Sequence, residues 1–272
     1  MVRVCLLQMQ SSQNLQVNLQ QLDKFAEQLE PSVDGRQLIV LPECALFFGQ
    51  GAQQQLKNAD GMQQYPLRDK LAELARQKNS YMIAGSISVH AGNNKLYNRS
   101  YCFSPEGKVL AHYDKLHLFD ANVNDGQGYQ ESKLFKAGDK IQVVDTNIGK
   151  LGLSICYDLR FPELYQHQRQ RGAEILVVPA AFTENTGKAH WQTLLRARAI
   201  ENQCFVVAAG QWGKHDNGRS TFGNTMVIDP WGEVLGCKQQ GTGWLCIDIE
   251  LSRLTEIRSN MPVFEHKRLS LQ

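Results

Sequence analysis

The stretch QLIVLPE, residues 37–43, is a short, continuous apolar run that ends in a proline and an acidic residue. Runs of this kind are typical of strands that are buried on both faces of a sheet. A similar run, ILVVP, occurs at residues 175–179. Amphipathic helix patterns alternate along the chain with strand patterns, the helices at 14–30, 66–79, 161–171 and 189–203 and the strands at 2–8, 81–90, 150–156 and 204–211. This alternation predicts an α/β fold.

The sequence repeats itself weakly between its two halves. The pattern Pro-x-Gly-x-Val-Leu at 105–110 recurs at 230–235, in the turns of two expected hairpins, and an LIVLP-like run precedes it both times. No linker rich in serine, glycine or proline divides the halves. We therefore predict a single domain over residues 1–272, whose two pseudo-repeated halves pack their mixed sheets face to face in a four-layer α-β-β-α sandwich. The polar tail, about 251–272, is expected to lie at a subunit interface.

Composition and charge argue against several classes of protein. Of 272 residues, 29 are basic and 27 are acidic, and this near-balance gives no support for a nucleic-acid groove or an anionic-membrane patch. No apolar run approaches the roughly 20 residues that a membrane helix requires. The seven cysteines include no C-x-x-C pair, so we expect reduced thiols in a cytoplasmic protein. In that compartment the glycosylation sequon at 98–100 carries little meaning.

Glu43 is the first of three chemically reactive residues that lie at the ends of predicted strands. Ligands collect at the carboxyl ends of strands in open α/β sheets. An acid that ends an apolar strand loses hydration unless it is paired, and burial is expected to raise its pKa and suit it to proton transfer. A surface glutamate at the start of a loop is an equally good interpretation of this segment alone.

Cys156 and Lys115 are the other two positions. Cys156 ends an expected strand, before a helix that begins near Pro162, and the positive end of that helix dipole is expected to lower the pKa of the thiol and present the sulfur to a ligand. The alternative is a small buried hydrophobic residue, which is the commoner role of a free cysteine. Lys115 ends a hairpin strand, where a lysine is ordinarily just solvated. The glycine-rich loop that follows, 120–132, is expected to form a lid or pocket wall.

Together these positions resemble the nitrilase superfamily of carbon–nitrogen hydrolases, in its Nit branch. The similarity is carried by LPE at 41–43, DKLHLFD at 114–120, CYDLRFPEL at 156–164, AHWQTLLRARAIENQCFVVAA at 189–209, DPWGEV at 229–234 and PVFEHKR at 262–268. The order Glu, Lys, Cys is that of the superfamily's triad. The resemblance implies a four-layer sandwich and a thiol-dependent hydrolase of linear amides. The histidines and cysteines lack the spacing of a zinc site, so we expect no metal, with His112 and His117 as the remaining candidates, and no cofactor.

The resemblance also implies a role for each residue. Glu43 is the general base, Cys156 is the nucleophile that forms a thioester, and Lys115 is a cation for the oxyanion. The backbone N–H of Tyr157 is the second oxyanion donor, and Glu131 is an auxiliary carboxylate that orients Lys115. A homodimer or larger homo-oligomer is the implied assembly.

The substrate that the resemblance implies is deaminated glutathione, the 2-oxo analogue of glutathione, cleaved to 2-oxoglutarate and cysteinylglycine. Phe182 and Thr183 are expected contacts of this small-molecule amide, and Arg160, Lys188 and Arg196 are candidates for its two carboxylates. Three alternatives remain open. They are an ω-amidase on 2-oxoglutaramate or another small-amide or N-carbamoyl hydrolase, an unrelated Cys-His hydrolase, and a catalytically silent binding protein.

Overall fold

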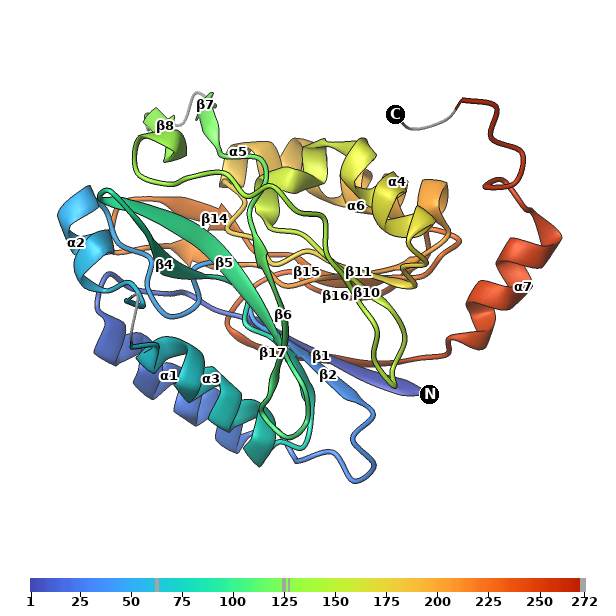
Figure 1. The fold of residues 1–272 in the computed structure, drawn as a ribbon, viewed down its shortest axis with the longest axis horizontal. Helices are drawn as coiled ribbons and strands as arrows, with labels where there is room; N and C mark the ends of the chain where they lie inside the picture. Colours follow the sequence, from blue (N-terminus) through green and yellow to red (C-terminus); the bar gives the residue numbers. More distant parts are fainter. Residues whose placement is uncertain (62–63, 124–125, 127, 270–272) are drawn as a thin grey trace.

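Two mixed β-sheets pack face to face in the computed structural model, which describes residues 1–61, 64–123, 126 and 128–269 (Figure 1). The first sheet has the order β17 (Gly243–Ile249), β1 (Val2–Gln8), β2 (Gln37–Val40), β3 (Tyr81–Ile83), β5 (Lys95–Phe103), β4 (Ile87–Gly92), and β6 (Val109–Asp114) also pairs with β5. The second sheet has the order β16 (Val234–Lys238), β15 (Thr225–Ile228), β12 (Phe205–Ala208), β11 (Ile175–Val177), β10 (Leu151–Leu153), β9 (Val143–Val144).

The internal repeat corresponds to a repeated strand topology. In the first half β1, β2 and β3 run parallel, and the antiparallel hairpin β5–β6 follows at β3. In the second half β10, β11 and β12 run parallel, and the antiparallel hairpin β15–β16 follows at β12. The two similar apolar runs, at 37–43 and 175–179, therefore form the equivalent strands β2 and β11, and the prediction of two pseudo-repeated halves is confirmed.

Helices cover the outer face of each sheet. The first sheet carries α1 (Leu15–Glu27) and α3 (Pro66–Gln77), and the second carries α4 (Pro162–Gln170) and α6 (Gln192–Asn202) (Figure 1). Asn14 caps α1, because its side-chain oxygen accepts the backbone N–H groups of Gln16 and Val17. The predicted four-layer α-β-β-α sandwich is thus confirmed.

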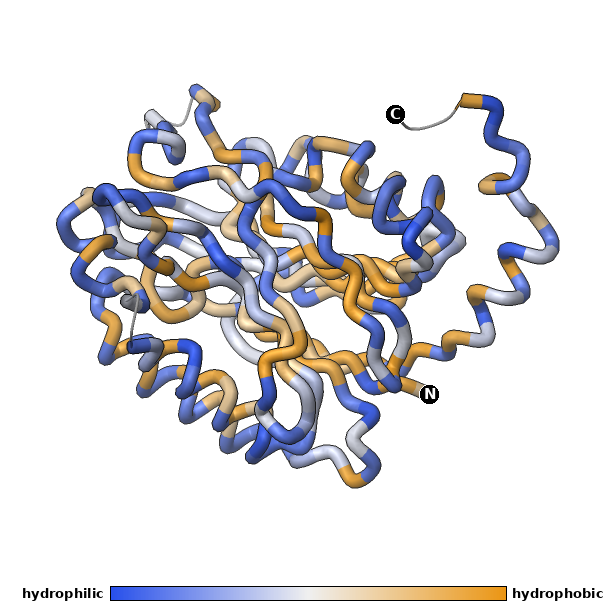
Figure 2. Tube along the Cα trace, viewed as in Figure 1, coloured by the Kyte–Doolittle hydropathy of each residue, from blue (hydrophilic) through white to orange (hydrophobic). Residues whose placement is uncertain are grey.

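Strand β1 shows why the layers assemble. Val4 and Leu6 point into the core between the sheets, whereas Cys5 and Leu7 point into the core beneath α1 and α3. Strand β2 alternates in the same way, so both faces of these strands are apolar. Figure 2 shows the resulting concentration of hydrophobic residues along the central strands.

Several elements differ from the sequence-based expectation. The strand expected at 81–90 is two strands, β3 and β4, because the chain turns at Gly85, where φ is +66°. The strand expected to end at Cys156 stops at Leu153, and a 3₁₀ turn, η2 (Cys156–Arg160), follows. Further elements were not expected from the sequence: α2 (Ala52–Lys57), the hairpin of β7 (Asp120–Asn122) and β8 (Gly128–Gln130), β9, α5 (Glu184–Thr186), the hairpin of β13 (Trp212–Lys214) and β14 (Ser220–Phe222), β17, and α7 (Ser252–Asn260).

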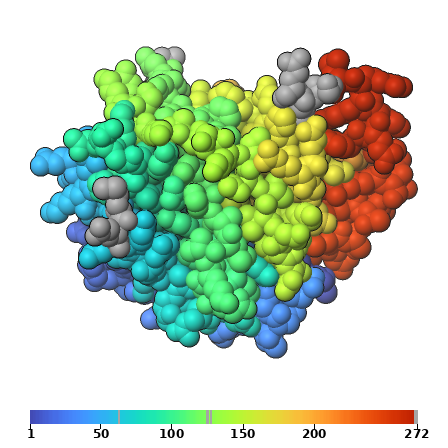
Figure 3. Space-filling view, viewed as in Figure 1, coloured from blue at the N-terminus to red at the C-terminus, as the bar shows by residue number. Residues whose placement is uncertain are grey.

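The C-terminal segment forms one edge of the molecule (Figure 3). Leu254 and Ile257 of α7 are buried against the same chain, and the guanidinium of Arg258 donates hydrogen bonds to the carbonyls of Gln203 and Ala173. The first half of the expected interface tail is therefore a docked helix. Within the described residues, no helix is both long enough and apolar enough to cross a membrane.

Candidate active site

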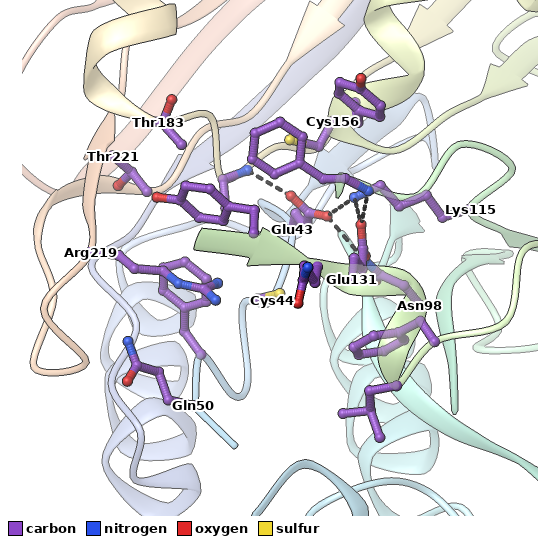
Figure 4. Close-up of a pocket in the computed structure, with 18 of the residues that line it drawn as sticks. Glu43, Cys44, Gln50, Asn98, Lys115, Glu131, Cys156, Thr183, Arg219 and Thr221 are labelled. Atoms are coloured by element: carbon purple, nitrogen blue, oxygen red, sulfur yellow. Dashed lines mark hydrogen bonds and ion pairs between the residues drawn. The ribbon is translucent and has the colours of Figure 1, made fainter. Parts of the chain in front are cut away.

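Three chain segments bring Glu43, Lys115 and Cys156 into one cavity. Glu43 lies shortly after β2, Lys115 directly follows β6, and Cys156 begins the η2 turn after β10. All three line a cavity of about 410 Å³ (Figure 4). Because the carboxyl ends of the central strands of both sheets face this cavity, residues far apart in sequence become neighbours.

Lys115 bridges two carboxylates at the bottom of the cavity. Its Nζ donates to Glu43 Oε1 at 2.9 Å and to Glu131 Oε2 at 2.9 Å, and the lysine side chain is only 3% exposed. Glu131, which opens the 3₁₀ turn η1 (Glu131–Lys133), also accepts the backbone N–H of Phe119 at 2.7 Å. Burial alone would lower the pKa of Lys115, but the two carboxylates raise it well above its usual value, so the ammonium stays charged.

The pKa of Glu43 differs from the expectation based on the sequence. Burial acts to raise its pKa, but the charge of Lys115 and the hydrogen bonds from Lys115, Cys156 and the backbone N–H of Ala181 outweigh burial, and the pKa is lowered. The expectation of a raised pKa was wrong because it considered burial without the buried ammonium. Glu43 is therefore an ionised carboxylate in contact with the thiol.

The expectation of a lowered pKa at Cys156 was also wrong. The side chain is buried, and burial together with the charge of Glu43 raises the pKa of the thiol well above its usual value, although Lys115 acts in the opposite direction. The short η2 turn is a weak source of positive potential compared with these charges. The resting site therefore pairs a protonated thiol with an ionised carboxylate.

Cys156 has a left-handed backbone conformation, with φ of +49°. Its own N–H donates to the carbonyl of Pro179 at 2.9 Å, which ties the turn to the end of β11. The N–H groups of the first residues of a helical turn have no partner within the turn. Tyr157, the second residue of η2, lines the cavity, and its N–H has no acceptor within the turn by this rule.

Asn98 is a site residue that the sequence analysis missed. Its side-chain Nδ2 donates to Glu43 Oε1 at 3.0 Å and to Glu131 Oε1 at 3.1 Å. The sequence drew attention to it only as part of a sequon, and no local pattern indicated its role. A neutral amide that donates to both carboxylates fixes their positions without adding charge.

Asp158 joins the lysine loop to the cysteine turn. It is fully buried and accepts the hydroxyl of Tyr113 at 2.7 Å, the N–H and ring nitrogen of His117 at 3.0 and 2.7 Å, and the N–H of Ile155 at 2.9 Å. The ring of His117 stacks on Phe161 at 3.6 Å. This network holds the segments that carry Lys115 and Cys156 in register.

Only some of the residues expected to contact the substrate line the cavity. Phe182, Thr183 and Arg160 line the cavity. Lys188 instead forms an exposed ion pair with Glu184 at 2.7 Å, and the Nε of Arg196 donates to the carbonyl of Gly232 at 2.8 Å; neither lines the cavity. They were wrong candidates, because a helix pattern does not reveal which face meets a pocket.

The expected lid loop is described only in part. Residues 124–125 and 127 lie outside the described residues, whereas Gly128, Tyr129 and Glu131 line the cavity. Over the ranges that the structure covers, no three histidine, cysteine or acidic side chains are grouped so that they could hold a metal ion.

The four-layer α-β-β-α sandwich thus brings a thiol, two carboxylates and an ammonium together at its strand ends, and the protein is a hydrolase of carbon–nitrogen bonds. The chain belongs to the carbon–nitrogen hydrolase family, whose model matches residues 3–259. The assignment to the nitrilase superfamily, made from the motifs, is thereby confirmed.

Individual relatives are similar to this chain over nearly its whole length. Deaminated glutathione amidase of Yersinia enterocolitica is 41% identical and covers 97% of this chain and 92% of its own. Omega-amidase NIT2 of Homo sapiens is 37% identical, over 99% of this chain and 96% of its own. The crystal structure of the Caenorhabditis elegans NitFhit protein is 40% identical, with a TM-score of 0.89 over 98% of this chain and 65% of that one.

Proposed function

We propose that this protein is an amidase that cleaves deaminated glutathione through a thioester on Cys156. The observation that carries the proposal is that Glu43, Lys115 and Cys156 line one cavity, in which the carboxylate of Glu43 accepts a hydrogen bond from the ammonium of Lys115. One group can then move the proton while its neighbour stabilises the charge that develops.

Acylation begins from the protonated thiol. Glu43 takes the proton as the sulfur of Cys156 attacks the amide carbonyl carbon, and the carbonyl oxygen becomes an oxyanion. Lys115 and the N–H of Tyr157 stabilise that oxyanion. The carbon–nitrogen bond then breaks, Glu43 gives the proton to the departing amine, and a thioester remains.

Deacylation uses the same groups in reverse. Glu43 takes a proton from water, the resulting hydroxide attacks the thioester, and the same two donors hold the second oxyanion. The carbon–sulfur bond breaks, the thiolate regains the proton from Glu43, and a carboxylic acid leaves. The raised pKa of Cys156 limits the lifetime of a free thiolate, so proton transfer is expected to accompany each attack.

The charges of the cavity support an anionic substrate. Its lining carries four basic residues and two acidic ones: Lys115, Lys133, Arg160, Arg219, Glu43 and Glu131. Lys115 is already paired with both acids, so the remaining basic groups are available to a ligand. Deaminated glutathione carries a carboxylate at each end of its cleaved amide, and its amidase is the named function of a relative 41% identical to this chain.

Hydrolysis of 2-oxoglutaramate is the second candidate, favoured by the similarity to omega-amidase NIT2. Both substrates give the same 2-oxoglutaryl thioester and differ only in the leaving group, cysteinylglycine or ammonia. Steady-state kcat/KM for the two compounds therefore tests the assignment. We expect a clear preference for deaminated glutathione, and a preference for 2-oxoglutaramate would overturn it.

Intact-protein mass spectrometry tests the chemistry separately from the substrate. Brief exposure to either compound should produce a 2-oxoglutaryl adduct on Cys156, and Cys156→Ala should produce none. If the wild-type protein turns over its substrate and Cys156→Ala does so equally fast, the thioester mechanism is wrong.

We also propose one domain over residues 1–272 and a cytoplasmic homo-oligomer. A single core cluster contains side chains from both sheets, which supports one folding unit, and all seven cysteines are free thiols, which fits a reducing compartment. Exposed Met261 and Leu269 near the C-terminus are candidates for a subunit contact. Light scattering of the full chain and of a chain that ends at residue 260 tests the assembly.

A further inference from the structure

A guanidinium group projects into the cavity from the side away from Lys115 (Figure 4). Arg219, which directly precedes β14, lines the cavity. Its Nε is buried and has no hydrogen-bond partner, and within the described parts of the chain no acidic side chain forms an ion pair with it. A buried guanidinium nitrogen without a partner is costly unless a ligand supplies one.

Two aromatic rings hold this guanidinium in place. Its Cζ lies 5.6 Å from the ring centre of Phe48 and 5.2 Å from that of Tyr129. The backbone is also fixed, since the carbonyl of Arg219 accepts the N–H of His215 at 2.8 Å and its N–H donates to Asn217 Oδ1 at 3.0 Å. The guanidinium is therefore positioned by two neighbouring rings, and its planar fork of N–H donors matches the geometry of a carboxylate.

The cavity contains a second guanidinium in a different place. Arg160 lies on the η2 turn of the nucleophile, four positions after Cys156, and its Cζ lies 5.1 Å from the ring centre of Phe182. Arg160 therefore belongs to the same turn as Cys156, the residue that carries the acyl group after the attack. The other guanidinium, that of Arg219, comes from the hairpin of β13 and β14.

Resting on the proposed function, we propose that Arg219 is the specificity-determining residue that binds the carboxylate of the leaving amine. The acyl group stays attached to Cys156 and lies beside Arg160. The candidate substrates share that acyl group, so a residue that separates them must contact the leaving group. The site then selects amides whose amine is a short peptide that ends in a free carboxylate.

The first test compares Arg219→Met with the wild-type protein on both substrates. We expect kcat/KM for deaminated glutathione to fall about 10- to 100-fold, mainly through KM, because a charge-assisted bidentate pair is lost. The kcat/KM for 2-oxoglutaramate should stay within about twofold. Lys214→Met is the matched control, because Lys214 is an exposed lysine of β13 and does not line the cavity, and it should leave both values unchanged.

The second test changes the substrate instead of the protein. An analogue of deaminated glutathione whose glycine carboxylate is a carboxamide should be a poorer substrate of the wild-type protein by the same factor. Arg219→Met should lose little further activity on this analogue, because the two changes remove one interaction. Arg219→Lys should recover part of the activity on deaminated glutathione, since it keeps the charge but not the planar fork.

The outcomes separate this inference from the proposed function. An Arg219→Met variant that loses equal activity on both substrates, or none on deaminated glutathione, overturns the role of Arg219 and leaves the amidase intact. A wild-type protein that cleaves neither compound overturns the proposed function. In that case binding of cysteinylglycine, followed by calorimetry, still decides the inference: binding that Arg219→Met abolishes supports it, and absence of wild-type binding overturns it.

Discussion

The side-chain amide of Asn98 donates a hydrogen bond to Glu43 Oε1 at 3.0 Å, and Lys115 donates to the same oxygen at 2.9 Å. The other oxygen of Glu43 accepts the N–H of Ala181 at 2.9 Å. The carboxylate that we propose as the general base is therefore held by three donors from three segments. Such an arrangement fixes both the position of the base and its ionised state.

Asn98→Asp is expected to reduce kcat by about 10²-fold or more, because a third carboxylate replaces a donor that two carboxylates share. The added negative charge opposes the ionisation of Glu43, so the acid limb of the kcat/KM profile should move to higher pH. A pH–rate profile between pH 5 and 9 measures this shift. If Asn98→Asp loses activity with an unchanged profile, Asn98 has only a structural role.

Lys115→Met should abolish turnover and also destabilise the fold, by about 3–5 kcal/mol, because it leaves two buried carboxylates without their cation. Without the ammonium, burial raises the pKa of Glu43 above its unfolded value. The variant should therefore gain stability as pH falls through that raised pKa. In the wild-type protein the pKa of Glu43 is lowered, so its contribution is present at neutral pH and is lost in acid.

Chemical denaturation of both proteins at pH 5 and pH 8 measures this difference. The stability gap between the wild-type protein and Lys115→Met should be smaller at pH 5. A gap that is the same at both pH values would contradict the assignment of the charges. Lys214→Met again serves as the control for loss of a lysine charge.

Glu43→Gln and Lys115→Met should change the reactivity of Cys156 in opposite directions. The charge of Glu43 raises the pKa of the thiol and the charge of Lys115 lowers it. At pH 7 iodoacetamide should therefore label Cys156 faster in Glu43→Gln than in the wild-type protein and more slowly in Lys115→Met, although both variants lose turnover. Labelling is followed by intact mass, with Cys156→Ala as the blank.

If Glu43→Gln slows alkylation as much as Lys115→Met does, Glu43 does not raise the pKa of the thiol. The charge assignment of the resting site is then wrong. Retained turnover in Glu43→Gln would instead remove Glu43 as the proton carrier.

The fold was predictable from the sequence because its central strands are unusually clear. The runs around β2 and β11 are continuous and apolar, and their recurrence in the same order predicted the repeated halves. Strand lengths were less predictable. The apolar run at 175–179 forms a regular strand only over Ile175–Val177, although the N–H groups of Val178 and Ala180 still donate to the carbonyls of Val207 and Ala209.

The site was predictable only where a motif marks it. Glu43, Lys115 and Cys156 lie in recognisable motifs, whereas Asn98 and Arg219 do not. The pKa directions could not be predicted at all, because each depends on charges that folding brings from distant segments. Whether a residue lines the cavity likewise depends on the orientation of its helix or turn. For this reason the sequence could not show that Arg160 lines the cavity and Arg196 does not.

Asp158→Asn is expected to uncouple the lysine loop from the cysteine turn. The fully buried carboxylate accepts hydrogen bonds from Tyr113, His117 and Ile155 through both of its oxygens. The amide of asparagine has only one accepting oxygen, because its NH2 group can only donate, so it cannot accept all of them. One or more donors are then left unsatisfied, at a cost of about 1–3 kcal/mol each. We expect a lower melting temperature and a fall in kcat that exceeds the change in KM.

The effect on kcat follows from geometry rather than from charge transfer, because Asp158 does not line the cavity. Tyr113→Phe is the matched control, since it removes one of the same hydrogen bonds and keeps the carboxylate, and its loss of kcat should be smaller. The rate of 2-oxoglutaryl adduct formation on Cys156, measured by rapid quench and mass spectrometry, should fall in parallel with kcat. An Asp158→Asn variant that is destabilised but acylates at the wild-type rate would show that the network supports only the fold.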